Sequence, residues 1–156
     1  MSKIEQKLKE LGIELPDAPK PAAVYVPVKR FNNNLMYVSG QDCRDHGELI
    51  YKGKVGSDLT VEQGYAAARQ AMINTLAVLK AELGDLDKIA HFVKLLGFVN
   101  SADGFVEQPY VINGASELLE EVFGEKGKHA RSALSANELP FNTPVEIETI
   151  IELEQE

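Results

Sequence analysis

The carboxyl-terminal part of the chain reads His129-Ala130-Arg131-Ser132-Ala133-Leu134, then Asn137-Glu138-Leu139-Pro140, then Pro144-Val145-Glu146-Ile147-Glu148-Thr149-Ile150-Ile151. The last segment alternates between two kinds of side chain. This predicts a β-strand with a core face and an acidic face, because successive strand side chains point to opposite sides. Residues 139–143 predict a turn, so we expect an antiparallel hairpin that brings Arg131 close to Glu146 and Glu148. An arginine beside carboxylates on a sheet is either an ion pair or part of a functional site.

Length and composition indicate one folded domain. The 156 residues fit a single domain spanning 1–156, in which we expect residues 1–21 to form an amino-terminal helix and a proline-rich extension. Apolar residues make up 44% and charged residues 26%, which is typical of globular proteins. The net charge of −8 and the lack of basic clusters interleaved with aromatics argue against a nucleic-acid partner.

Cysteine usage and hydropathy bear on the compartment. Cys43 is the only cysteine, so no intramolecular disulfide can form, and we expect this side chain to pack in the interior. The first residues carry charges without the apolar run of a secretory signal, and no 18-residue apolar stretch follows. We therefore expect a cytoplasmic protein that does not enter a membrane.

Periodicity predicts the remaining elements. Ser2 and Glu5 have the spacing of a helix capping box, and apolar residues recur at helical spacing as far as Gly12. A second capping box, Thr60 with Gln63, begins a long amphipathic helix that we expect to end at Gly84. The patterns predict helices at 60–83 and 109–123, strands at 24–28, 35–39, 49–51 and 89–99, a turn at 32–34, and an extended connector at 15–21.

This order of elements predicts an α+β fold in which two helices cover one face of a single mixed sheet. The other face would carry Glu146 and Glu148, together with Ile150 and either Met36 or Val38. A partly apolar face without helices must meet solvent or another subunit, and we expect it to be buried against another copy of the chain.

Several well-known site motifs are missing from the sequence. It has no nucleophile elbow, Walker loop, dinucleotide-binding glycine pattern, HExxH or cysteine-pair metal motif. The histidines His46, His91 and His129 lie in different predicted elements and share no metal-ligand spacing. We therefore expect neither a metal nor a cofactor.

Several blocks together resemble the RidA/YjgF family, formerly described as L-PSP-type endoribonucleases or translation inhibitors. The most specific feature is the fifteen-residue separation of Arg131 and Glu146 with Leu139-Pro140 between them. The matching pieces are Asn34-Leu35-Met36-Tyr37-Val38-Ser39-Gly40-Gln41, Phe92-Val93-Lys94, Asn113, Ala130-Arg131-Ser132, Leu139-Pro140 and Val145-Glu146-Ile147-Glu148.

The resemblance implies a chorismate-mutase-like homotrimer that hydrolyses 2-aminoacrylate-type enamines and imines to 2-keto acids and ammonia. Such intermediates are released by pyridoxal-phosphate dehydratases, with which we expect a functional link and no stable complex. By resemblance, Arg131 clamps the substrate carboxylate and Glu146 orients the attacking water. Substrate-binding roles carry over to Gly40, Ala133, Tyr25 and Asn113, in a pocket between subunits.

The sequence also departs from the family pattern. Ala133 stands where a cysteine is frequent, which is compatible with a backbone contact. The amino-terminal helix and the segment 44–59 are longer, as in a larger-sized branch of the family.

Four alternatives stay open. Arg131 could form only a cross-strand ion pair with Glu146 or Glu148. The protein could be a non-catalytic trimer that binds 2-keto acids, or an endoribonuclease as the older family name suggests. Chorismate mutase shares the architecture, but its substrate carries two carboxylates, and the sequence offers one convincing pocket cation, Arg131.

Overall fold

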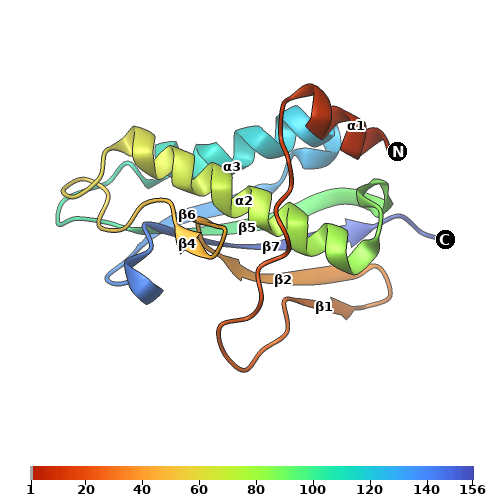
Figure 1. Ribbon diagram of the computed structural model, residues 1–156, viewed down its shortest axis with the longest axis horizontal. Coiled ribbons are helices and arrows are strands. Elements are labelled where there is room, and N and C mark those ends of the chain that lie inside the picture. The colour runs from red at the N-terminus through yellow and green to blue at the C-terminus, as the bar shows by residue number, and fades with distance from the viewer. Residues whose placement is uncertain (1) are drawn as a thin grey trace.

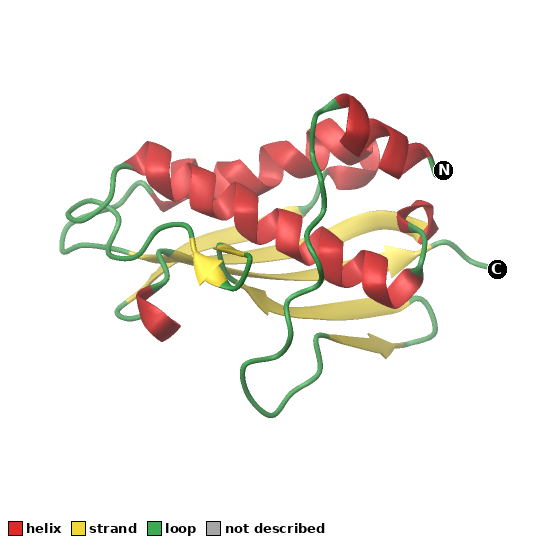
Figure 2. Ribbon diagram, viewed as in Figure 1, coloured by secondary structure: helices red, strands yellow, loops and turns green. Residues whose placement is uncertain are grey.

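The computed structural model describes residues 2–156, which form a layer of helices on a mixed five-stranded sheet (Figures 1 and 2). The helices α2 (Val61–Leu83) and α3 (Gln108–Phe123) lie on the same face of the sheet. The predicted α+β architecture is therefore confirmed. The strands follow the order β1 (Val28–Phe31), β2 (Leu35–Gln41), β7 (Val145–Leu153), β5 (Ile89–Asn100) and β6 (Ala130–Ala136).

The two long helices begin and end where the sequence predicts. Thr60 and Gln63 form the expected capping box at the start of α2, and Gly84 ends that helix with a positive φ of 76°. The helices pack very closely at Gly114 of α3, where an added Cβ would lie 2.1 Å from the Tyr65 carbonyl oxygen. This contact fixes α3 against α2 and so fixes the position of α3 over the sheet.

The hydrophobic core lies between these helices and the sheet. In β7 the predicted alternation is confirmed, since every second residue from Val145 to Leu153 is buried. Strand β5 contributes Leu95 and Val99 to the same layer, and both are fully buried. The large, fully buried side chains of the core are Phe92, Met36, Met72, Leu76, Leu79, Leu86, Ile89, Leu95, Ile112, Leu118, Leu119 and Ile147.

The predicted carboxyl-terminal hairpin is wrong. Strand β6 pairs in parallel with β5, and β7 pairs antiparallel with β5 on the other side, so β5 separates the two segments. A strand–helix–strand connection commonly returns parallel to its first strand, and α3 makes that connection here. The turn after β6 instead carries the chain past the end of β5, where Asn100 N–H donates to the Pro144 carbonyl (2.8 Å).

The sheet face opposite α2 and α3, here called the open face, differs from the prediction in one strand. Met36 and Val38 are 1% and 2% exposed and belong to the helix-covered core, so their assignment to the open face is wrong. Tyr37 pairs with Ile150 and takes that place. The open face thus combines acidic and apolar side chains, and its partly exposed apolar members are Tyr37, Leu96, Phe98, Leu134 and Ile150.

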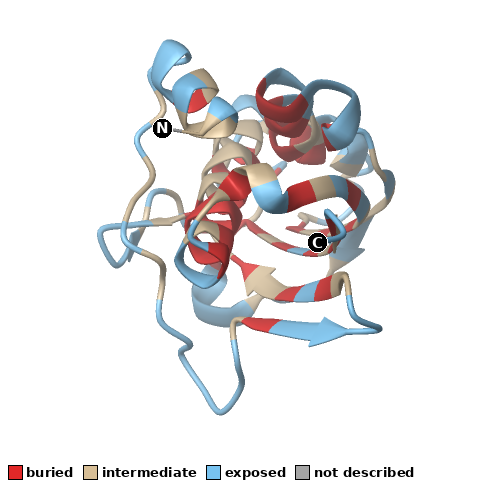
Figure 3. Cartoon of the chain, turned by 90° about the vertical axis from the view of Figure 1, so that its right-hand side faces the viewer, coloured by how far each residue is buried: buried red, intermediate tan, exposed pale blue. Residues whose placement is uncertain are grey.

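The predicted amino-terminal helix is present as α1 (Lys3–Glu10), and it docks on the body. Ser2 and Glu5 form the capping box, and the Asp87 carboxylate accepts hydrogen bonds from the backbone N–H groups of Lys3 (2.8 Å) and Ile4 (2.9 Å). The connector after α1 crosses α2 and descends beyond the edge of the sheet at β1 (Figure 1). Figure 3 shows that the lower part of this connector is largely exposed.

Two smaller predictions need adjustment. The first strand begins at Val28 and continues to Phe31, because Pro27 has no N–H to donate to a strand partner; residues 24–26 are exposed loop. The strand predicted at 49–51 is shorter, with β4 (Glu48–Leu49) paired to β3 (Arg44–Asp45). Over residues 2–156, no helix has the length and apolar character needed to cross a bilayer.

Candidate functional site

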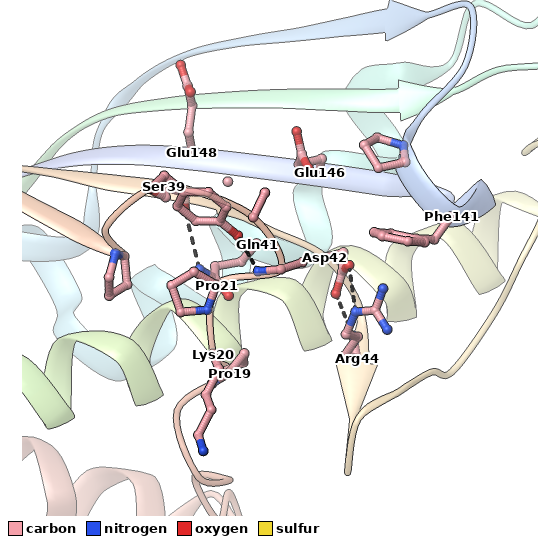
Figure 4. Close-up of a pocket in the computed structure, with 16 residues that line it drawn as sticks. Pro19, Lys20, Pro21, Ser39, Gln41, Asp42, Arg44, Phe141, Glu146 and Glu148 are labelled. Atoms are coloured by element: carbon pink, nitrogen blue, oxygen red, sulfur yellow. Dashed lines mark hydrogen bonds and ion pairs between the residues drawn. The ribbon is translucent and has the colours of Figure 1, made fainter.

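A cavity of about 570 Å³ lies beside the acidic residues of β7 (Figure 4). Its walls come from the proline-rich connector, the end of β2, the segment 42–44 and the short helix η3 (Pro140–Asn142). Of the predicted site residues, the cavity brings together Glu146, Gly40 and Tyr25, which we call the Glu146 half-site.

Glu146 is the half-buried acid of this cavity. Its side chain and that of Glu148 project from the same side of β7 in Figure 4. Burial raises the pKa of the Glu146 carboxyl, and the negative charges of Asp42 and Glu148 raise this pKa further. A carboxyl group with a raised pKa can take up and release a proton closer to neutral pH.

Gly40 makes room for Glu146. The pairing of β2 with β7 shifts register between Val38 and Gln41, so Gly40 lies in an irregular part of the strand. A Cβ at position 40 would lie 3.0 Å from both Cγ and Cδ of Glu146. The Glu146 side chain therefore rests directly on the Gly40 backbone.

Tyr25 belongs to a loop tied to the end of β2. Its phenol oxygen accepts a hydrogen bond from Ala22 N–H (3.2 Å). Ser39 holds the same loop twice, because its hydroxyl donates to the Val26 carbonyl (2.7 Å) and its N–H donates to the Pro27 carbonyl (2.9 Å). These contacts keep the loop against the cavity.

The structure adds cavity residues that the sequence analysis missed. Arg44 and Lys20 both line the cavity, so the expectation of a single pocket cation is wrong. The Arg44 Nε donates to the Asp42 carboxylate (3.1 Å), and its Cζ lies 5.0 Å from the centre of the Phe141 ring. Phe141 adopts a positive φ of 58°, which is uncommon for a bulky residue. The sequence signal that could have placed Asp42 and Arg44 in the cavity is their position just after Gly40.

Cys43 lies between these two residues in sequence but points into the core. It is fully buried, and burial raises the pKa of its thiol. A buried thiol with a raised pKa is a poor nucleophile at neutral pH, which agrees with the predicted packing role.

The other predicted site residues gather at β6 and α3. Arg131 donates from Nη1 to the Ser116 hydroxyl (3.0 Å) and from Nη2 to the Pro109 carbonyl (3.1 Å). Burial lowers the pKa of the guanidinium. Ala133 lies on the same side of β6, and Asn113 is one helical turn after Pro109. We call Arg131, Ala133 and Asn113 the Arg131 half-site.

The two half-sites lie on opposite faces of the sheet. Arg131 is paired with Leu95, a core residue, whereas Glu146 is paired with Phe98 on the open face. Paired residues of neighbouring strands share a face, so Arg131 and Glu146 cannot meet within one chain. The predicted closeness of these residues is therefore wrong for a single chain, and among residues 2–156 Arg131 has no carboxylate partner.

In the described part of the chain, no three His, Cys, Asp or Glu side chains are grouped so that they could share an ion.

Comparison with known proteins identifies the family. The family model described as "YjgF/chorismate mutase-like, putative endoribonuclease" matches residues 5–153. Protein TCP17 of Trypanosoma cruzi is 43% identical over 152 residues, which cover 97% of this chain and 94% of that protein.

Two solved structures have closely similar folds. A protein of unknown function from Agrobacterium tumefaciens shares 48% identity with a TM-score of 0.90, covering 97% of this chain and 93% of that one. A Shewanella oneidensis protein described as a putative endoribonuclease shares 35% identity with a TM-score of 0.94, covering 97% and 100%. Because both the sequence match and the fold extend over nearly its whole length, the chain belongs to the YjgF/chorismate mutase-like family, the RidA/YjgF family that its motifs resemble.

Proposed function

We propose that the protein hydrolyses 2-aminoacrylate-type enamines and imines to 2-keto acids and ammonia. The observation that carries this proposal is Glu146, a half-buried acid with a raised pKa in a cavity of about 570 Å³. This volume lies within the range of ordinary small-ligand sites. Family membership supports the same assignment.

The site requires a second copy of the chain. Arg44 in the Glu146 cavity is already paired with Asp42, whereas Arg131 has no carboxylate partner among the described residues and lies on the other side of the sheet. Strand β6 is an edge strand, and the open face carries exposed apolar side chains such as Tyr37 and Leu134. Such edges and faces favour association. We propose a homotrimer in which Arg131 of one copy faces Glu146 of the next.

The proposed reaction adds one water across the C=N bond. Enamine substrates first tautomerise to the imine. The Glu146 carboxylate takes a proton from water as the water oxygen bonds to the imine carbon, and it returns that proton to the nitrogen. In the carbinolamine so formed, Glu146 takes the hydroxyl proton and passes it to nitrogen while the C–N bond breaks. The products are a 2-keto acid and ammonia.

Arg131 contributes binding and orientation. Its planar guanidinium matches a carboxylate with two parallel N–H donors, which a lysine would not reproduce. Holding the carboxylate in this way would place the imine carbon beside the water that Glu146 orients.

A dehydratase-coupled assay tests the proposal. Threonine dehydratase generates 2-aminocrotonate, and the protein should accelerate the release of 2-ketobutyrate beyond the spontaneous rate. The variants Arg131→Ala and Glu146→Gln should each lose roughly 100-fold or more of kcat/KM, as expected for a carboxylate clamp or a general base. An unchanged release rate with wild-type protein would contradict the proposal, and sedimentation as a monomer would contradict the shared site.

Two other activities would give different results. A binding-only trimer would bind 2-ketobutyrate in calorimetry and leave the release rate unchanged. An endoribonuclease, the activity in the name of the Shewanella oneidensis relative, would cleave RNA. The net charge of −8 weighs against that activity, because RNA binding is dominated by phosphate contacts.

A further inference from the structure

A hydrogen-bond chain runs from Arg131 into the interior of the same subunit. Arg131 Nη1 donates to the Ser116 hydroxyl (3.0 Å), and Ser116 lies 2.8 Å from Nε2 of His129. The other ring nitrogen of His129, Nδ1, lies 2.6 Å from the carbonyl oxygen of Gly127. We call Ser116 and His129 the Arg131 support.

The Gly127 carbonyl fixes the direction of the bond at His129 Nδ1, and a neutral His129 ring then sets the direction of the other bonds. A carbonyl oxygen can only accept, so Nδ1 of His129 carries the hydrogen that Gly127 receives. In the neutral imidazole Nε2 is then an acceptor, and the Ser116 hydroxyl donates to it. The hydroxyl oxygen keeps its lone pairs for the Arg131 N–H. The chain is therefore fully paired in one direction, and each bond polarises the next.

The end of the chain rests on rigid backbone. Gly127 closes the turn η2 (Gly124–Gly127) against α3, and an added Cβ there would lie 2.1 Å from the Leu119 carbonyl oxygen. Such a close approach leaves little freedom to the Gly127 carbonyl. Arg131 is held a second time by the Pro109 carbonyl, at the start of α3.

These contacts leave the guanidinium available for a ligand. An arginine has five N–H donors, and the bonds to Ser116 and Pro109 use two of them. Three donors remain, which is enough for a bidentate contact with a carboxylate. The fork is thus fixed in orientation before any ligand arrives, which reduces the entropy lost on binding.

We propose that Ser116 and His129 are positioning residues that hold the Arg131 fork ready for the substrate carboxylate. This inference rests on the proposed function, because it assigns the carboxylate contact to Arg131. Neither residue touches the substrate. Their effect should therefore appear in carboxylate recognition and not in the chemical step.

The experiment compares Ser116→Ala, Ser116→Thr and His129→Gln with wild type. Alanine has the higher helix propensity, so Ser116→Ala should not weaken α3. There are two matched controls. Ser135→Ala changes an exposed serine on the same strand as Arg131, and His91→Gln changes a histidine of β5 that contacts Glu152 of β7. For each variant we would measure the melting temperature, and kcat and KM for dehydratase-generated 2-aminocrotonate. Calorimetry would measure the binding of 2-ketobutyrate and of the uncharged 2-ketobutyramide.

We expect Ser116→Ala to raise KM about tenfold with kcat changed less than about twofold, the pattern of lost binding. Its preference for 2-ketobutyrate over the uncharged amide should fall by a similar factor, and Ser116→Thr should restore both values because it keeps the hydroxyl. Glutamine can accept from Ser116, so His129→Gln should have a smaller effect. The two controls should behave as wild type.

Three results would overturn the inference. In the first, Ser116→Ala keeps the wild-type KM and the wild-type preference for 2-ketobutyrate over the amide, while Arg131→Ala is inactive. The proposed function would then stand, but Ser116 and His129 would not be positioning residues. Failure of Ser116→Thr to restore carboxylate discrimination would lead to the same conclusion. A wild-type protein that neither turns over 2-aminocrotonate nor binds 2-ketobutyrate would instead contradict the proposed function, and with it this inference.

Discussion

The Glu146 half-site and the Arg131 half-site are built in different ways. The Glu146 half-site is assembled from a loop, an irregular strand end and the proline-rich connector. Burial raises the pKa of its acid, and the neighbouring negative charges of Asp42 and Glu148 raise it further. The Arg131 half-site stands on β6 and α3, where hydrogen bonds fix the guanidinium. The Glu146 half-site contributes an acid, and the Arg131 half-site contributes a cation that has no carboxylate partner among the described residues.

This difference fits a separate role for each half-site in the proposed reaction. A fixed fork of donors suits recognition, because a ligand gains most from groups that are already in place. A carboxyl group with a raised pKa suits proton transfer, because it exchanges protons closer to neutral pH. Association of two copies would bring the two properties together and would give the open face its partner.

The largest effect should come from mixing two inactive variants. In the proposed trimer each site takes Arg131 from one copy and Glu146 from another, so co-expressed Arg131→Ala and Glu146→Gln chains should form some sites with both native residues. Every mixed trimer has one site in three with both native residues, so we expect about a third of the wild-type activity, from two variants that are each reduced roughly 100-fold. The measurement is the coupled assay on mixed oligomers purified through two different tags.

A control for this experiment co-expresses the same tagged variants each with itself. If the mixed oligomers stayed as inactive as the single variants, the two half-sites would not come from different copies, and the comparison between them would lose its basis.

The next largest effect should be a loss of protein stability from a substitution at Gly127, in η2 beside the Arg131 half-site. Gly127→Ala places a Cβ 2.1 Å from the Leu119 carbonyl oxygen, so backbone must move. We expect the free energy of unfolding to fall by about 1–3 kcal/mol, the usual range for overpacking. Chemical denaturation measures it. The control is Ala136→Gly, which also changes one methyl group, on β6. Gly104→Ala would be a poor control, because the positive φ of Gly104 adds backbone strain of its own.

A glycine in the Glu146 half-site should behave differently. At Gly40 the added Cβ meets the Glu146 side chain at 3.0 Å, and a side chain can turn away where backbone cannot. Gly40→Ala should therefore lower kcat about tenfold by displacing the carboxylate, which costs little stability. The coupled assay and a thermal melt measure both quantities. A stability loss as large as that of Gly127→Ala, with normal kcat, would show that the two halves do not differ in this way.

The smallest effect concerns pH. Glu148 helps to raise the pKa of Glu146, so Glu148→Gln removes a negative charge and favours the ionised form of Glu146. The pKa of Glu146 then falls, and the acid limb of kcat/KM should move to lower pH. The measurement is a pH–rate profile.

Glu154→Gln is the matched control for this profile, since Glu154 pairs with Lys126 just beyond the end of β7 and is not among the groups that shift Glu146. An acid limb that moved equally in both variants would reflect net charge and not the neighbourhood of Glu146.

Much of the fold could be predicted from local patterns. The capping boxes at Ser2 and Thr60, the helix ends at Leu83 and Phe123 and the alternation from Val145 to Leu153 each depend on a few neighbouring residues, and the structure confirms them. The candidate site residues Arg131 and Glu146 came instead from the resemblance to the RidA/YjgF family, through their fifteen-residue separation.

The tertiary structure alone decided how these pieces meet. The same alternating strand could pair with β6 or with β5, because a period of two residues defines the faces of a strand and not its neighbour. Strand β5 takes the place between β6 and β7, and this puts Arg131 and Glu146 on opposite faces. The cavity cation Arg44 and the support of Arg131 by Ser116 and His129 also depend on contacts between distant segments, which local sequence periodicity does not encode.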